Sequence, residues 1–373
     1  MTSSAVALVG ASHTPPRANV EDRSYEEMIF DAATAALADA GLTITDIDSV
    51  VLSTSDQVHG RVIESMVTTG AAGGVGRDVT TLASGGDHAF IYACLRLKAG
   101  QARRVLVAVA SKESEGRNPS HADWLSAEPF LMRPLGISSV AAAGLQASAY
   151  AAQFGFDAER VAEVGRRRRA AWARVHDPIE VDDPSRPAAW PLTRGDLPAP
   201  CDVACAAVLV APDAVQPGQT PAWIDGIGWA EDRYQLGERD LTRFASLEAA
   251  AVMALGEGRT CFDVDVVEVQ EISTVASFAA LESLGLAARG EGASRTEDGS
   301  PAVNPSGGNL PGNPGNAAGF LRLLAAAQQV RGRAGAAQVT PRPVRAIGAA
   351  MHGFAGQGAS VVVFAATRGA EVA

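Results

Sequence analysis

Cysteine is scarce in this chain, which has four among 373 residues: Cys94, Cys201, Cys205 and Cys261. Only Cys201 and Cys205 stand close together, and one such pair does not supply the four ligands of a structural zinc site. Four scattered cysteines are also too few for the disulfide framework of a small secreted fold. We therefore expect buried thiols with a packing role, and we predict no metal site.

Long apolar runs and an excess of positive charge are missing as well. No window of about 18 residues is apolar and free of charge, so no membrane-spanning helix is predicted. The first residues lack the basic segment and apolar core of a signal peptide, so we expect a cytoplasmic protein. A formal net charge of −11 is unfavourable for binding nucleic-acid phosphates. With 47% hydrophobic residues, the chain is long enough for two core-forming halves of one globular protein.

The sequence pattern contains an internal duplication. Each copy opens with a strand, an amphipathic helix and a second strand, at residues 5–10, 25–40 and 48–53 in the first copy and 222–228, 244–255 and 265–270 in the second. Each helix is followed by a glycine, Gly41 or Gly256, and each second strand is a short β-branched run behind an acidic turn. A repeated strand–helix–strand unit predicts parallel strands with helices on both faces, and hence the α/β class.

Both copies continue in the same order with a glycine-rich turn, a helix and two further strands. The turns lie at 84–86 and 304–308, the helices begin near 89 and 317, and the strands lie at 105–110, 206–210, 344–348 and 359–364. Between the copies, residues 112–200 are rich in proline, arginine and tryptophan, which suits a cap over an active site. We predict an N-terminal half at 1–111 and 201–213, a cap at 112–200 and a C-terminal half at 214–373.

The first glycine-rich turn has the surroundings of a reactive group. It reads Leu82-Ala83-Ser84-Gly85-Gly86 and joins a β-branched segment to an apolar helix. The start of such a helix presents free N–H groups and the positive end of its dipole, where enzymes place a thiolate or bind an anion. Ser84 is a conceivable nucleophile, but no activating base is evident and capping of the helix is the simpler role. Asp87 and His88 follow, and we expect capping there too, with reach into the site as the alternative.

The second half carries a matching set of motifs. Asn304-Pro305-Ser306-Gly307-Gly308 is followed by Gly312-Asn313-Pro314 and Ala317-Ala318-Gly319, and the last strand is preceded by a glycine-rich loop that starts at His352. This ordered set resembles the Asn-x-x-Gly-Gly, Gly-His-Pro and Ala-x-Gly signature of the thiolase superfamily, specifically the sterol-carrier-protein-type thiolases and the lipid-transfer proteins grouped with them. Nearly the whole chain is covered. The resemblance implies a duplicated, five-layered α-β-α-β-α fold.

Departures from the family pattern decide which chemistry we expect. In a conventional thiolase, the resemblance implies, the cysteine of a Cys-x-Ser-Gly turn takes the acyl group and the histidine of Gly-His-Pro activates it. Leu82 stands at the cysteine position and Asn313 at the histidine position, and neither side chain ionises near neutral pH. In the loop after residues 266–269, only the acidic Glu271 matches in kind. We therefore predict a thiolase-like protein that lacks the catalytic cysteine.

The remaining groups would still polarise a carbonyl oxygen: the N–H groups of Gly85 and Gly356 and the amide of Asn313. Lipid-transfer-type relatives include aldolases, so the resemblance permits retro-aldol or aldol chemistry on a CoA- or carrier-linked β-hydroxyacyl substrate of lipid metabolism. Such a protein is an aldolase, a lyase or an acyltransferase-like enzyme. His352 and Glu271 are the candidate acid/base residues, and no cofactor is predicted besides the CoA thioester substrate. The other predicted substrate-binding residues are Leu82, Ser84 and Gly308.

A second function stays open at this point: a non-catalytic subunit that binds acyl-CoA or lipid, or a scaffold within a heteromeric complex. It explains the missing groups together, because binding can outlast chemistry in a duplicated fold. Leu82 would then line an apolar acyl pocket. The polar architecture around Ser84, Gly85 and Asn313 favours the enzyme, since a scaffold does not require it.

The resemblance also implies partners. It predicts a small acyl-CoA-binding subunit with an OB-fold, and a homodimer formed through the strand at residues 105–110. Four consecutive arginines, residues 166–169, lie on a helix predicted to begin near Asp157. They either bind the phosphates of CoA or form a solvated face with salt bridges. Consecutive positions point around a helix, so at most two of them reach one ligand.

Overall fold

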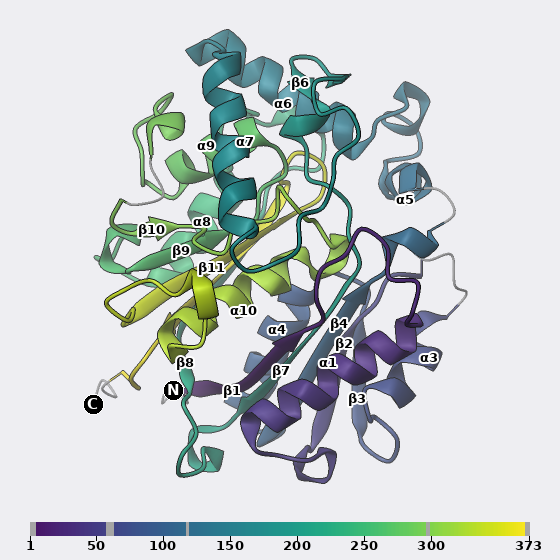
Figure 1. Ribbon diagram of the computed structural model, residues 1–373, viewed down its shortest axis with the longest axis vertical. Coiled ribbons are helices and arrows are strands. Elements are labelled where there is room, and N and C mark those ends of the chain that lie inside the picture. The colour runs from purple at the N-terminus through teal and green to yellow at the C-terminus, as the bar shows by residue number, and fades with distance from the viewer. Residues whose placement is uncertain (1–4, 57–62, 117–118, 296–298, 370–373) are drawn as a thin grey trace.

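A mixed sheet of ten strands organises the computed structural model, which describes residues 5–56, 63–116, 119–295 and 299–369 (Figure 1). The N-terminal half contributes β1 (Val6–His13), β2 (Ser49–Ser53), β3 (Asp78–Leu82), β4 (Arg104–Ser111) and β7 (Val203–Val210). The C-terminal half contributes β8 (Ala222–Glu231), β9 (Val266–Val269), β10 (Ala302–Val303), β11 (Arg345–His352) and β12 (Gly358–Ala365).

The two halves repeat one strand order. It is β1-β7-β4-β2-β3 in the first half and β8-β12-β11-β9-β10 in the second. The three strands at the outer end of each half are parallel, and the other neighbours are antiparallel. The halves join where β1 pairs with β8 over three residue pairs, among them Ala7 with Trp223. The duplicated α/β arrangement predicted from the sequence is confirmed.

Helices fill three layers around the two halves of the sheet. Between them lie α4 (Gly86–Lys98) and α10 (Ala318–Arg331), which pack on each other and share one hydrophobic core with the inner sheet faces. The outer face of the first half is covered by α1 (Tyr25–Ala40), and that of the second by α8 (Ala245–Leu255) and α9 (Thr274–Ser283). Three separate cores therefore hold five layers, α-β-α-β-α.

Local signals place several helices accurately. α1 spans the predicted residues because Ser24 and Glu27 form a capping box at its start and Gly41 ends it in the left-handed region, at φ 66°. α9 has no counterpart in the sequence analysis. All ten of its residues are buried, so no polar face marks its period. Among the described residues, no helix combines the length and apolar character needed to cross a bilayer.

The cap follows β4 and lies at the upper end of the molecule in Figure 1. It contains α5 (Pro119–Ser126), α6 (Ser139–Phe154), α7 (Ala158–Trp172) and the short pair β5 (Pro187–Ala189) and β6 (Leu192–Thr193). The carboxylate of Asp157 accepts the N–H groups of Glu159 and Arg160, which starts α7 where the sequence predicted it. Residues of α5 and α6 and the segment 197–200 help to line a cleft described below.

One prediction about assembly is wrong in its location. Residues 105–110 belong to β4, which pairs along its length with β2 on one side and β7 on the other. Its backbone groups are therefore already bonded, and this strand presents no edge to a second copy. The outermost strand of this half is β3, whose pairing is with β2 alone among the described strands.

Candidate active site

A cleft lies under the cap, where α4 begins and where β11 ends. It has a volume of about 510 Å³. Both halves and the cap contribute to its wall. Its lining includes Gly85 and Asp87 from the start of α4, Asn313 before α10, His352 at the end of β11, and Asp123 and Leu197 from the cap.

At the floor of this region, His352 meets Glu231, which ends β8. The two residues flank Gly358 of β12 in the sheet register, so all three side-chain positions lie on one sheet face. His352 Nε2 is 2.6 Å from Glu231 Oε1. A Cβ at Gly358 would lie 2.0 Å from that nitrogen and 2.4 Å from that oxygen, so the pair forms only because Gly358 has no side chain.

Neighbouring negative groups favour the protonated form of His352. Burial alone lowers the pKa of His352, but the hydrogen bond to Glu231 and the negative charges of Asp87 and Glu231 outweigh it, so the pKa of His352 is raised above the usual 6.5. The same hydrogen bond lowers the pKa of Glu231 against the opposing effect of its partial burial. The other ring nitrogen, Nδ1 of His352, has no hydrogen-bond partner among the described residues.

A second imidazole adjoins the first. The rings of His88 and His352 meet edge to face, with centroids 4.5 Å apart. His88 Nδ1 is 2.5 Å from Ser84 Oγ, and its Nε2 is 3.9 Å from Asp87 Oδ2. Ser360 of β12 donates to the same Asp87 oxygen at 2.6 Å. Two imidazoles, two carboxylates and two hydroxyls from distant segments therefore form one polar cluster.

This cluster also brings one potential metal-ligand atom from each of Asp87, His88 and His352 within 4.8 Å of the others. Protein groups already hold one nitrogen of each ring and the Asp87 carboxylate. We therefore interpret the cluster as an acid–base network.

Two expectations about the first turn need correction. Ser84 does not cap α4: the N-cap residue is Gly85, with no side-chain cap bond, and the Ser84 hydroxyl instead pairs with His88. A base is thus placed against Ser84, which the sequence analysis did not anticipate. Leu82 ends β3 and packs against the central core, so it does not line the cleft.

Glu271 also lies outside the cleft. Its neighbours Gln270 and Ile272 line the cleft, but Glu271 is fully buried on the other side of the chain. There Glu271 Oε1 accepts a hydrogen bond from Nε of Arg168, on cap helix α7, at 2.7 Å. The proposal of Glu271 as an acid/base residue is therefore corrected, because a carboxylate sealed in an ion pair does not reach a substrate in the cleft.

Of the other predicted site residues, three line the cleft and two do not. Gly85, Asn313 and His352 are brought together at the cleft, and the Asn313 Oδ1 atom has no partner among the described residues. Their roles stay predictions. Gly308 and Gly356 do not line the cleft: both have positive φ and pack tightly, since a Cβ would lie 2.1 Å from Glu271 Oε2 at Gly308 and 2.4 Å from the Phe244 ring at Gly356.

All four cysteines are buried, as expected, and none of them lines the cleft. Burial raises the pKa of each thiol, to about 12 for Cys94 and Cys261. A buried thiol of raised pKa is a poor nucleophile near neutral pH.

The arginine run is mostly engaged by the protein itself. Arg166 and Arg167 both pair with Glu163, Arg168 pairs with Glu271, and Arg169 donates to the carbonyl of Gly195. Arg166 and Arg169 also line a hollow of about 740 Å³ within the cap. Salt bridges thus account for three of the four, and phosphate binding stays a prediction for Arg166 and Arg169.

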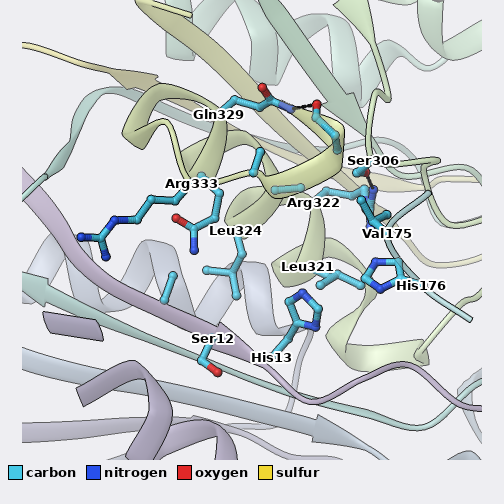
Figure 2. A pocket seen from close by; sticks show the side chains of 15 residues that line it. Ser12, His13, Val175, His176, Ser306, Leu321, Arg322, Leu324, Gln329 and Arg333 are labelled. Carbon is cyan, nitrogen blue, oxygen red and sulfur yellow. Dashed lines mark hydrogen bonds between the residues drawn. The ribbon is translucent and has the colours of Figure 1, made fainter. Parts of the chain in front are cut away.

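A smaller hollow of about 140 Å³ lies beside α10, apart from the cleft (Figure 2). His13 and His176 face each other there with ring centroids 5.5 Å apart. Burial, and then the positive charges nearby, lower the pKa of His176 to about 3. Beside them Arg322 binds Glu268 and Ser306, which joins α10 to β9 and to the loop after β10. We assign this hollow a packing role.

Glu231 and Ser360 are the site residues that the sequence analysis missed, and for Asp87 and His88 it favoured helix capping over a place in the site. Glu231 belongs to no motif and carries no local signal, because only the register of β8, β12 and β11 brings it to His352. The serine–histidine spacing of four residues at Ser84 and His88 was the one visible signal, since positions i and i+4 share a helix face.

Comparison with known proteins gives a consistent class. Residues 228–366 match the thiolase C-terminal domain-like family. An acetyl-CoA acetyltransferase of Methanothermobacter thermautotrophicus is 26% identical over 356 residues, which cover 90% of this chain and 93% of that protein. Among solved structures, an Ltp2-ChsH2(DUF35) aldolase has a TM-score of 0.79 at 22% identity, with 99% of both chains covered.

A monomeric SCP2-thiolase-like protein type 1 of Mycobacterium smegmatis has a TM-score of 0.74 at 18% identity, over 99% of this chain and 79% of that one. The protein is therefore a mixed α/β protein with the thiolase fold. The C-terminal match and the acetyl-CoA acetyltransferase show sequence similarity to thiolases, and the solved structures show the thiolase fold.

Proposed function

We propose that this protein is a thiolase-fold enzyme that breaks or forms a carbon–carbon bond of a CoA- or carrier-linked β-hydroxyacyl substrate without an acyl-cysteine intermediate. The observation that carries the proposal is the His352–Glu231 pair beside a cleft that also holds Gly85 and Asn313. An acid/base group and hydrogen-bond donors share one cleft, whereas the thiols are buried elsewhere.

In the retro-aldol direction, His352 takes the proton of the β-hydroxyl group. The oxygen's electron pair then forms a carbonyl while the bond between Cα and Cβ breaks, and its electrons pass into a thioester enolate. The N–H of Gly85 and the amide of Asn313 stabilise the enolate oxygen, and a proton returned to Cα completes the reaction. Glu231 stabilises the positive charge that His352 carries in between.

The proposed assembly includes a small acyl-CoA-binding subunit and a second copy of this chain. The name of the Ltp2-ChsH2(DUF35) aldolase pairs a protein of this fold with a second component, which supports the search for such a subunit. We place the proposed homodimer at β3, because among the described strands β3 pairs with β2 alone.

The test is product detection by mass spectrometry after the protein, alone and with any small subunit that co-purifies, is incubated with a panel of acyl- and β-hydroxyacyl-CoAs. A shortened acyl-CoA with a matching aldehyde or ketone supports the proposal. His352→Ala should then reduce turnover roughly 10²- to 10⁴-fold while leaving substrate affinity nearly intact. His13→Ala, outside the cleft, is the matched control. Intact substrate bound at stoichiometric level would instead favour the non-catalytic scaffold.

A further inference from the structure

We propose that Ser84 is a nucleophile activated by His88, and that the chain accepts acyl groups from thioesters on this serine. This activity is separate from carbon–carbon cleavage, because it needs no β-hydroxyl group on the substrate. The contacts of Ser84 support this role, and no hydrolase sequence motif is involved.

The first observation is the pairing itself. Ser84 Oγ lies 2.5 Å from His88 Nδ1, a short hydrogen bond between a hydroxyl and an imidazole. The hydroxyl of a serine before a helix usually accepts a hydrogen bond from a backbone N–H group of the first turn. Here Gly85 is the N-cap residue, and the Ser84 oxygen is directed to a base instead. A hydroxyl beside an imidazole is the arrangement by which an enzyme activates a serine.

The second observation is that a negatively charged carboxylate lies close to His88. Its Nε2 faces Asp87 Oδ2 at 3.9 Å, and Ser360 fixes that carboxylate with a 2.6 Å hydrogen bond. The ring of His352 packs edge to face on the ring of His88. A carboxylate behind a histidine stabilises the imidazolium that forms when the serine gives up its proton. Ser84, His88 and Asp87 thus supply a nucleophile, a base and a charge-stabilising carboxylate within five consecutive residues.

The third observation is location. Gly85 and Asp87 line the cleft, and Ser84 immediately precedes them at the start of the 13-residue helix α4. The first N–H groups of a helix have no intrahelical acceptor, so those of Gly85 and Gly86 are available to an oxyanion. Ser84 and His88 are both partly exposed and adjoin the residues that line the cleft.

The step balances without any further reagent. The Ser84 oxygen bonds to the thioester carbonyl carbon while its proton passes to His88. The carbon–sulfur bond then breaks, and the departing thiolate takes the proton from His88, which leaves an acyl ester on Ser84 and a free thiol. Water attacks the ester in a second step, with His88 again moving the proton, and releases a carboxylic acid and the free serine.

The test uses hexanoyl-CoA, which has no β-hydroxyl group and cannot undergo retro-aldol cleavage. The full chain is mixed with it and quenched in acid, and the intact protein mass is measured together with the rate of thiol release. Wild-type protein should carry one hexanoyl group on the peptide that contains Ser84. Ser84→Ala should carry none, and His88→Gln should lower thiol release roughly 10²- to 10⁴-fold.

Ser24→Ala is the matched control, because Ser24 caps α1 and has no imidazole partner; it should behave as wild type. Ser84→Cys should carry the acyl group as a thioester, which keeps the test valid if Ser84→Ala folds poorly. Equal thiol release by wild type and folded Ser84→Ala, or an adduct that persists in Ser84→Ala, would overturn the proposal. Neither result bears on the β-hydroxyacyl reaction, which this substrate does not probe.

Discussion

Glu231 and His352 are 121 residues apart in the chain, yet Glu231 Oε1 and His352 Nε2 lie 2.6 Å apart. They meet across a strand position occupied by Gly358, and no other residue type would leave both side chains room there. The pair raises the pKa of the imidazole and lowers that of the carboxylate. The acid/base character of the site is therefore a property of three neighbouring strands.

Replacing Glu231 should move the pH dependence of turnover. A general base works in its neutral form, so kcat/KM should rise with pH through the pKa of His352, with a midpoint above 6.5 in the wild type. Glu231→Gln removes a negative charge and weakens a hydrogen bond, and both favour the protonated ring of His352. The lowering effect of burial on the pKa of His352 is then less opposed. The midpoint should therefore shift to lower pH, although Asp87 still faces the ring. A pH–rate profile of both proteins measures this, and an unchanged midpoint would contradict it.

Gly358→Ala should reduce activity without reducing the stability of the fold. The added Cβ would meet the movable ends of the His352 and Glu231 side chains, which can swing apart without a backbone shift. We expect a melting temperature near that of the wild type, a lower pKa of His352 and a rate reduced by roughly 10²-fold or more. NMR titration of the imidazole and a thermal melt measure the two effects. A large loss of stability with normal activity in the remaining folded protein would show that the pair is not needed.

Arg168 and Glu271 should matter for stability. Their ion pair joins cap helix α7 to the C-terminal half, and their side chains are 4% and 0% exposed. Removal of one partner leaves an uncompensated buried charge, so Arg168→Met should lower the free energy of unfolding by about 3–5 kcal/mol. The double variant Arg168→Met/Glu271→Leu should regain much of this loss. Urea unfolding measures both.

The matched control for this experiment is the exposed pair of Arg167 and Glu163 on the same helix. Arg167→Met should cost less than about 1 kcal/mol, because water screens an exposed pair. Similar losses for Arg167→Met and Arg168→Met would contradict the anchoring role of the buried pair.

The edge of β3 should carry the proposed homodimer. Thr81 is exposed on this strand, whose outer backbone groups have no partner strand among the described residues. Thr81→Lys places a charge on the edge, where lysine opposes strand pairing. Sedimentation analysis should show a dimer for the wild type and a shift towards monomer for Thr81→Lys. The control is Ser185→Lys, which places the same charge on the exposed surface of the cap, away from β3. This variant should stay dimeric.

Local patterns predicted much of the architecture. The limits of α1 follow from Ser24 and Gly41, which act on the helix ends directly, and the duplicated order of strands and helices along the chain follows from repeated periodicity. Predictions failed where neighbours came from elsewhere in the chain. Residues 105–110 have the same apolar pattern whether the strand is central or at an edge, so only the sheet order showed that β4 is internal. The all-buried α9 had no polar face to mark it.

The sequence by itself determined the α/β class, the duplication, the glycine-rich turns and the presence of His352 beside one of them, because these depend on spacing and on the conformations that short segments favour. Tertiary structure decided which groups meet. It paired His352 with Glu231, turned Ser84 towards His88, and sealed Glu271 against Arg168. The physical reason is that charge and hydrogen bonding act over a few ångströms, and only strand register and helix packing set distances that short between residues far apart in the chain.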